Sequence, residues 1–184
     1  LATSAGNITI DAQGGDTDII FKGTDSSSDI TALTIDMSDG GILQTRAGVG
    51  FPATQVASTG ANVLDEYEEG IFTPGIASSG GSLTTVSSAN GFYTKIGKMV
   101  HVQVGFVVSN VGSGSSHIDI SSLPFTSAST GVVHTMMTSA RETEVLGQND
   151  EIIMTRDSTT MRILGAHFGN NMGYSTNFIY RAET

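Results

Sequence analysis

An alternation of apolar and polar residues over residues 99–108 is the clearest pattern in the chain. Successive side chains of a strand point to opposite sides, so this segment is predicted to be a strand with two different faces. One face carries Val100, Val102, Val104, Phe106 and Val108, and the other carries Met99, His101, Gln103, Gly105 and Val107. We expect the first face to lie in a core and the mixed second face to contact another sheet or another subunit.

Shorter apolar segments continue to the end of the chain. Expected strands cover residues 83–86, 92–96, 117–120, 131–138, 151–156, 161–168 and 176–182, with a turn at 78–82 and a hairpin turn at 157–160. No amphipathic helix longer than two turns is visible in the sequence. Many short strands separated by turn residues favour an all-β fold, with a jelly-roll-like two-sheet sandwich as a head domain at residues 76–184.

A loose repeat of strand and turn occupies residues 1–60. The expected strands cover residues 7–12, 18–22 and 29–37, and stretches rich in Gly, Asp and Ser separate them. Three such strands have too little apolar area to form a core alone, whereas identical strands from neighbouring chains could complete one. The pattern predicts an intertwined β stem built by a homotrimer. A flexible linker is the alternative, and the alternation of apolar and polar residues disfavours it.

Residues 61–75 are interpreted as a neck that joins this stem to the head. Asn62 could cap a short helical turn that Gly70 ends, with an extended segment up to Pro74. In a trimer, the acidic side chains of the neck would repel one another near a shared axis. These carboxylates must therefore point to water or pair with cations, and we expect them to point to water. The candidate cations are Lys95, Lys98 and Arg46. The residues expected at the subunit junction are Leu64, Tyr67, Phe72 and Pro74.

Charge is distributed unevenly along the chain. The net charge is −10, of which residues 1–60 carry −5, residues 61–75 carry −4 and residues 76–184 carry −1. A protein that binds nucleic acid needs a positive face, so nucleic acid is not an expected partner. The chain has no cysteine, which excludes disulfides and thiolate metal sites. No apolar run approaches membrane-spanning length, so membrane insertion is not expected.

The sequence has no arrangement typical of a metal site or a catalytic centre. The acids of residues 65–69 lack the glycine spacing of a calcium loop. The four histidines are scattered without a metal-binding spacing, and no serine lies in a G-x-S-x-G motif. The acids of the expected head could supply the carboxylate pair of a glycosidase, but no pattern marks one. We therefore expect no cofactor, no metal and no enzymatic activity.

Three segments, taken in order, resemble a known family. Residues 64–74 read Leu-Asp-Glu-Tyr-Glu-Glu-Gly-Ile-Phe-Thr-Pro and are similar to the LDDYEEGTFTP signature of tailed-bacteriophage fibre and appendage proteins. The segments Gly-Phe-Tyr-Thr-Lys-Ile-Gly at 91–97 and Leu-Pro-Phe-Thr-Ser at 123–127 match in the same order. In that family the signature lies between a thin stem and a C-terminal β head. The resemblance therefore implies a virion fibre in an external appendage.

The resemblance implies a tail fibre or similar appendage that attaches non-covalently to a glycan or protein of the host surface. Its partners would be the other copies of a homotrimer, other virion proteins at the N-terminal end and the host receptor. Polar loops at residues 110–117, 139–150 and 169–175 could contact that receptor, although such loops are also common without a ligand. The candidate contact residues are Arg141, Asn149, Asn170, Asn171 and Tyr174. Two alternatives remain: a purely structural fibre or decoration protein, and an enzyme that depolymerises host polysaccharide.

Overall fold

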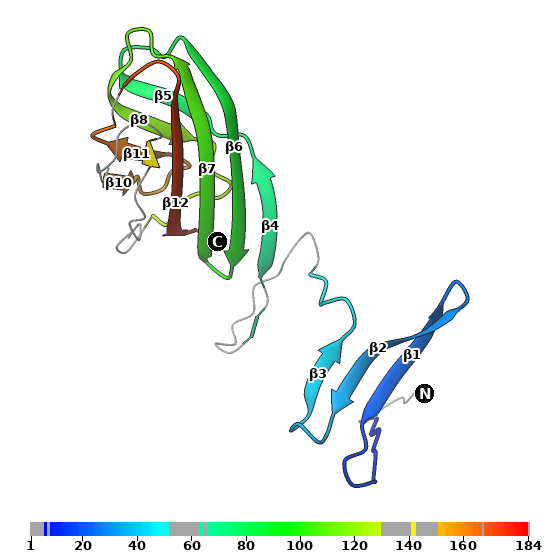
Figure 1. The fold of residues 1–184 in the computed structure, drawn as a ribbon. Helices are drawn as coiled ribbons and strands as arrows, with labels where there is room; N and C mark the ends of the chain where they lie inside the picture. The colour runs from blue at the N-terminus through cyan, green and yellow to red at the C-terminus, as the bar shows by residue number, and fades with distance from the viewer. Residues whose placement is uncertain are drawn as a thin grey trace. The chain divides into compact units, whose positions relative to one another are not determined.

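The described residues of the chain form an all-β structure in two compact units. The computed structural model describes residues 6, 8–51, 63–64, 66–129, 141–142, 151–166 and 168–183, with the backbone alone at residues 141, 142 and 151. The units comprise Leu1–Gly50 and Phe51–Thr184 (Figure 1). The described strands form three sheets, and every pair of neighbouring strands is antiparallel. The prediction of an all-β fold is confirmed.

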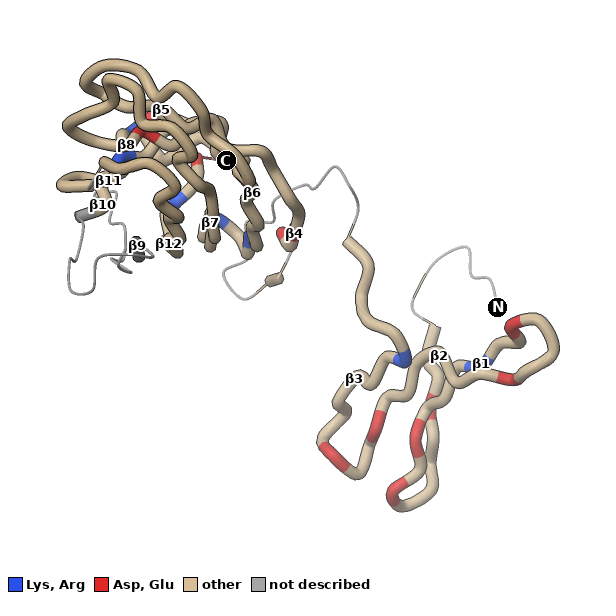
Figure 2. The backbone as a smooth tube through the Cα atoms, turned by 45° about the horizontal axis from the view of Figure 1, so that its top comes forward, with Lys and Arg blue, Asp and Glu red and all other residues tan. Residues whose placement is uncertain are grey.

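The first unit contains one sheet with the strand order β1-β2-β3. Its strands are β1 (Ile19–Asp25), β2 (Ser28–Asp36) and β3 (Ile42–Thr45). The predicted strands at 18–22 and 29–37 are confirmed, whereas β3 was not predicted. The predicted strand at 7–12 is wrong in its described part, because residues 8–12 are in no strand. Acidic residues are spread over the strands and turns of this unit (Figure 2).

One face of the first sheet is apolar and has no cover among the described residues of its own unit. Phe21 is paired with Leu33, and Ile35 lies between Ile19 and Leu43 in the strand register. These five side chains therefore share one face. None of the described residues of the unit is buried, and Leu43 is 67% exposed. The first unit thus has no hydrophobic interior among its described residues, as the sequence predicted.

The second unit contains two sheets. The five-stranded sheet has the order β4-β6-β7-β12-β9, and the four-stranded sheet has the order β10-β11-β8-β5. The strands of the first are β4 (Tyr67–Phe72), β6 (Thr85–Ile96), β7 (Met99–Asn110), β12 (Met172–Arg181) and β9 (Arg141–Glu142). Those of the second are β10 (Glu151–Met154), β11 (Met161–Leu164), β8 (Ser115–Ser121) and β5 (Gly75–Gly80).

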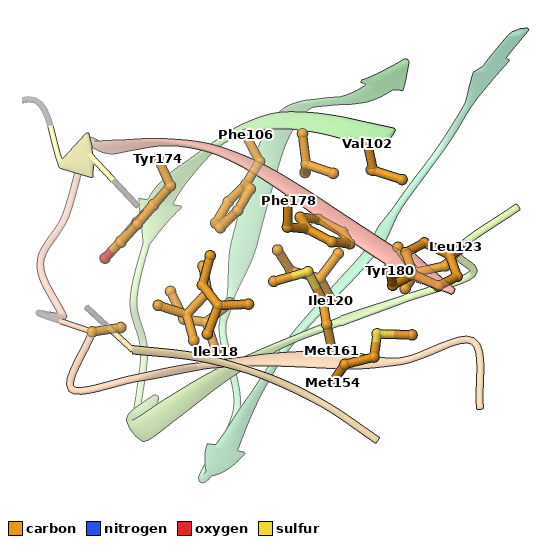
Figure 3. Packing of buried hydrophobic residues seen from close by; sticks show 14 of the residues in the cluster. Val102, Phe106, Ile118, Ile120, Leu123, Met154, Met161, Tyr174, Phe178 and Tyr180 are labelled. Atoms are coloured by element: carbon orange, nitrogen blue, oxygen red, sulfur yellow. The ribbon is translucent and has the colours of Figure 1, made fainter. Parts of the chain in front are cut away.

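Both sheets contribute to a single hydrophobic core (Figure 3). The five residues predicted for the buried face of β7, Val100 to Val108 at alternate positions, are each at most 2% exposed, so that prediction is confirmed. Ile118, Ile120 and Met161 of the four-stranded sheet are fully buried in the same cluster. The hydroxyl of Tyr180 donates a 2.8 Å hydrogen bond to the carbonyl oxygen of Phe125, so this buried polar group is paired.

Several predicted strand boundaries change in the structure. The segments 83–86 and 92–96 belong to one long strand, β6, which stays paired with β7 across two register irregularities. The hairpin turn at 157–160 is confirmed, because β10 and β11 on either side of it are paired. The predicted strand at 131–138 lies outside the described residues.

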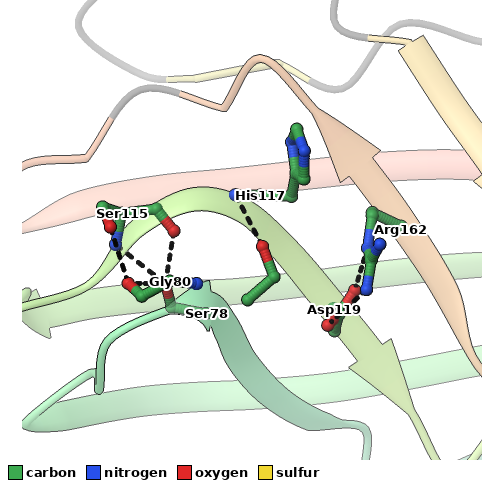
Figure 4. A network of polar contacts seen from close by, with 7 residues as sticks. Ser78, Gly80, Ser115, His117, Asp119 and Arg162 are labelled. Carbon is green, nitrogen blue, oxygen red and sulfur yellow. Dashed lines mark hydrogen bonds and ion pairs between the residues drawn. The ribbon is translucent and has the colours of Figure 1, made fainter.

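Serine side chains hold the strand that sequence patterns assigned to a turn. Most of the predicted turn at 78–82 lies in or next to β5, which pairs with β8. The hydroxyl of Ser78 donates to the carbonyl oxygen of Ser115 at 2.6 Å, and the hydroxyl of Ser115 donates to the carbonyl oxygen of Gly80 at 2.7 Å (Figure 4). Hydrogen bonds from serine hydroxyls to backbone carbonyls hold β5 here, where apolar side chains usually hold a strand. The sequence therefore lacks the apolar–polar alternation from which strands are predicted.

The described part of the neck is a strand and not a helical turn. Tyr67–Phe72 forms β4, and Glu68 pairs with Lys95 in the neighbouring β6. The predicted helical turn is therefore wrong for Tyr67 to Gly70. A pairing partner distant in the sequence overrides the local capping signal, because each residue of a paired strand gains ladder hydrogen bonds and cross-strand contacts.

Candidate functional site

Carboxylates of the neck bind side chains on the core-facing side of β6, and we call this contact the β4–β6 seam. It comprises Glu66, Glu68, Tyr93 and Lys95. The Nζ atom of Lys95 lies 2.7 Å from Oε2 of Glu66, and the two side chains are only 10% and 14% exposed. The hydroxyl of Tyr93 donates a 2.6 Å hydrogen bond to Oε1 of Glu68. The favoured expectation, that the neck carboxylates point to water, is wrong for Glu66, which instead pairs with Lys95.

The hydrogen bond to Glu68 alters the acid–base behaviour of Tyr93. A phenolate next to a carboxylate would lose the hydrogen bond and meet a like charge. The hydrogen bond to Glu68, together with partial burial and the carboxylate charge, raises the pKa of Tyr93 to about 12. On the opposite face of β4, a hydrogen bond to Glu69 likewise raises the pKa of Tyr67. Both phenols therefore stay protonated donors at neutral pH.

Two glycines allow the aromatic side chains of the seam to lie against the backbone. A Cβ atom at Gly70 would lie 2.7 Å from the hydroxyl oxygen of Tyr93, and a Cβ atom at Gly91 would overlap the ring of Phe72. The rings of Phe72 and Tyr93 lie 6.5 Å apart, and Tyr93 makes an edge contact with Phe125 at 5.4 Å. The neck strand is therefore attached to the core through aromatic packing as well as through charge.

The residues predicted for the subunit junction occupy different environments. Leu64 is 61% exposed, whereas Pro74 is buried. Tyr67 is half-buried and donates a 2.8 Å hydrogen bond to Glu69. Phe72 packs against the core of its own chain. Of these four residues, Leu64 is thus the one that is mostly exposed, so most of its surface could contact another subunit.

Of the predicted ligand residues, Asn170 and Asn171 are exposed, and the backbone of Arg141 pairs with Ser175 of β12. The side-chain oxygen of Asn170 accepts a 2.9 Å hydrogen bond from the backbone N–H of Val111, so it ties two loops together. Asn171 has a left-handed backbone with φ 61°, a conformation common for asparagine in turns. Tyr174 is 3% exposed and stacks on Phe106, so its prediction as a surface residue is wrong. The side chain of Arg141 and the whole of Asn149 lie outside the described residues.

The side of the five-stranded sheet that faces away from the core is a second candidate site, which we call the outer face. Its side chains follow from the strand register, which sets three rows across β4, β6, β7 and β12. The rows are Tyr67–Ile96–Met99–Arg181, Glu69–Thr94–His101–Ile179 and Ile71–Phe92–Gln103–Asn177. The first row is mainly apolar, the second is mainly polar, and the third has two apolar side chains and two carboxamides.

Phe92 lies at the centre of three shallow hollows on the outer face. They measure about 130, 270 and 380 Å³, and Phe92 lines each of them. Its ring is 52% exposed, and Ile71 next to it on β4 is 78% exposed. Sequence reasoning marked the mixed side of β7 as a contact face but missed its extension onto β4 and β6. The alternate positions Phe92, Thr94 and Ile96 could have indicated one face of a strand. Apolar side chains on a strand usually predict a buried face, whereas these point to solvent.

A hollow of about 480 Å³ lies next to Lys95, and both Asp157 and Glu183 line it. Hydrogen bonds from the backbone N–H and hydroxyl of Ser129 lower the pKa of Glu183. A general acid for glycoside hydrolysis needs a raised carboxyl pKa. The shift at Glu183 has the opposite direction, so this geometry does not favour an acid role for it.

Metal-ligating side chains do not gather in the part of the chain that the structure describes, where no three His, Cys, Asp or Glu residues could hold one ion. The same described residues include no helix long and apolar enough to cross a membrane. Comparison with known proteins adds no assignment, because no family model, no curated protein and no solved structure matches the chain.

Proposed function

We propose that the chain is a bacteriophage virion fibre protein, a tail fibre or similar appendage, that assembles as a homotrimer and attaches non-covalently to a host surface glycan or protein. Three sequence segments that resemble phage fibre proteins, in the same order, support this proposal. The all-β fold agrees with it, and we infer a jelly-roll-like arrangement for the two sheets of the second unit. In this proposal the protein lies on the outside of the virion.

The observation that carries the proposal is the uncovered apolar face of the first unit. Ile19, Phe21, Leu33, Ile35 and Leu43 share that face, yet none of them is buried. A small three-stranded sheet without a buried side cannot offset the loss of chain entropy on folding. The same face of neighbouring copies offers an uncharged cover, and the acidic residues around it would stay in water. The N-terminal unit is therefore proposed as the stem, with other virion proteins at its far end.

One observation favours a second candidate, a structural fibre that binds only other virion proteins. Asn170 and Asn171 were predicted to contact a receptor, but Asn170 bonds to the backbone of Val111 and Asn171 adopts a turn conformation. Tyr174 lies in the core. The receptor-binding part of the proposal thus rests on the resemblance, and the assembly part rests on the geometry.

Sedimentation of the full chain and retention by host cells test the two parts separately. We expect a trimer at micromolar concentration, and we expect Leu33→Ser with Ile35→Ser to weaken it. Thr34→Ala, which alters the opposite face of β2, is the matched control and should leave the trimer intact. Retention on host cells without release of oligosaccharide supports an adhesin, whereas a trimer that host cells do not retain supports the structural fibre. A folded monomer contradicts the stem, and release of oligosaccharide indicates a depolymerase.

A further inference from the structure

The exposed apolar side chains of the second unit are concentrated on one surface. Seven large apolar side chains of its described residues are exposed, and four of these lie on the outer face. They are Ile71, Phe92, Ile96 and Met99, with exposed fractions of 78%, 52%, 45% and 54%. Monomeric proteins rarely leave such a group of large apolar side chains in water, so the outer face has the character of an interaction surface.

The charges on the outer face suit contact with a copy of the same chain. The three rows include only two charged residues, Glu69 on β4 and Arg181 on β12, and β6 and β7 separate their strands. When identical units pack around an axis with this face inward, the β4 side of one copy meets the β12 side of the next. Opposite charges then approach each other, whereas a partner with a strongly charged surface would find no counterpart here.

The polar groups of the outer face are also self-complementary. Gln103 and Asn177 are neighbours in the strand register. A carboxamide both donates and accepts hydrogen bonds, so equivalent amides of neighbouring copies can satisfy one another around an axis. Four strands spaced by about 4.8 Å and three rows spaced by about 6.8 Å give a face of about 390 Å². Two such faces reach about 780 Å², less than the roughly 1,000 Å² of an interface that is stable by itself, so this contact would add to the one proposed for the first unit.

We propose that the outer face of the five-stranded sheet is a second self-association surface, through which the second units of neighbouring copies pack with Phe92 toward the shared axis. This inference rests on the self-association proposed above, but it places a contact in the second unit, which has its own core. The assembled protein would thus be held together in both units. The three shallow hollows around Phe92 would be filled by side chains of the neighbouring copies and would not remain open to a ligand.

A single spin label on the full chain tests this placement, because the chain has no native cysteine. Gln103→Cys places the label at the centre of the outer face, and Ala77→Cys places it on exposed β5 of the opposite sheet as the matched control. We expect strong dipolar broadening between copies at position 103 and little at position 77. An oligomer with no more broadening at 103 than at 77 overturns the inference but leaves the proposed stem. A monomer overturns both.

A pair of variants tests the energetic role of the face. Phe92→Ser with Met99→Ser should raise the concentration at which the broadening at position 103 is half lost by about tenfold or more, because two large apolar side chains leave the contact. Ile153→Ser removes a comparably exposed side chain, 43% exposed, from the opposite sheet and should leave that concentration unchanged. If Phe92→Ser with Met99→Ser instead abolishes retention on host cells while the broadening is unaltered, the face is a receptor site and the inference is wrong.

Discussion

Lys95 and Glu66 form an ion pair of 2.7 Å in which both side chains are almost withdrawn from solvent. The pair joins the neck to β6, and Lys95 also lies 5.6 Å from the centre of the Phe125 ring. A second ion pair, between Arg162 and Asp119, joins β11 to β8 but is 44% and 23% exposed (Figure 4). The Arg162–Asp119 pair has two hydrogen bonds and the Lys95–Glu66 pair has one, but the Lys95–Glu66 pair is much more buried, so the comparison sets burial against bond number.

Removal of one partner should be costly in the first pair and nearly neutral in the second. We expect Glu66→Gln to lower the free energy of unfolding by up to about 3 kcal/mol, because it leaves the ammonium group of Lys95 uncompensated in a poorly solvated site. Asp119→Asn should cost about 0–1 kcal/mol, the usual value for an exposed pair. Denaturant unfolding at one protein concentration measures both, since the apparent stability of a self-associating chain depends on concentration. Equal losses would contradict the assigned burial.

The hydrogen bond from Tyr93 to Glu68 should make stability depend on pH in alkaline solution. The folded state raises the pKa of Tyr93 from 10.0 to about 12. A raised folded-state pKa means that the contribution is present below pH 10 and is lost as the pH rises toward 12. In a phenolate absorbance titration, Glu68→Gln should move one tyrosine back toward its ordinary pKa. Glu69→Gln is the control, because it should act on Tyr67 and leave Tyr93 unchanged.

The two faces of β7 should respond differently to the same charge. We expect Val104→Asp to abolish folding of the second unit, because Val104 is 2% exposed and an aspartate there would be buried without a partner. Gln103→Asp, one residue earlier, places the same charge on the outer face and should keep the β-type circular dichroism spectrum. If both variants lose that spectrum, the strand does not have the alternation described above.

The contact between Gly91 and Phe72 should appear as an energetic coupling. Gly91→Ala should destabilise the protein by about 1–3 kcal/mol, because the added methyl group meets the Phe72 ring in a packed site. Phe72→Ala removes that obstacle, so the double variant should lose less stability than the sum of the two single variants. Denaturant unfolding of the four proteins of this cycle measures the coupling, and strict additivity would contradict the contact.

Sequence patterns predicted the parts of the fold where burial alternates along a strand. The buried face of β7 is an example, because Val100 to Val108 alternate without interruption and each buried side chain contributes hydrophobic free energy. The same reasoning predicted that residues 1–60 form no core alone, and none of the described residues up to Gly50 is buried. β5 was missed because Ser78 and Ser115 stabilise it through hydrogen bonds, which leave no apolar period in the sequence.

The neck and the predicted ligand residues depended on distant contacts that a local pattern cannot contain. The acidic run after Asn62 is a good helix start by itself, but pairing with β6 makes Tyr67–Phe72 a strand. Tyr174 was assigned to a polar loop at residues 169–175, yet it lies in β12 and its side chain points into the core. The outer face was recognised only on β7, since its continuation requires knowing that β4 and β6 lie beside that strand.

The lack of a buried residue among the described residues of the first unit has a consequence for the order in which the protein folds. The second unit has a core of its own, so each chain can form it without help and at a rate that does not depend on how many chains are present. In the proposed trimer, the first unit gains its apolar contacts only after copies have met, so we expect its folding to be a reaction of higher than first order. Dilution should therefore slow the last step of refolding and leave the first step unaltered. Newly made chains that stay close together would complete the stem fastest.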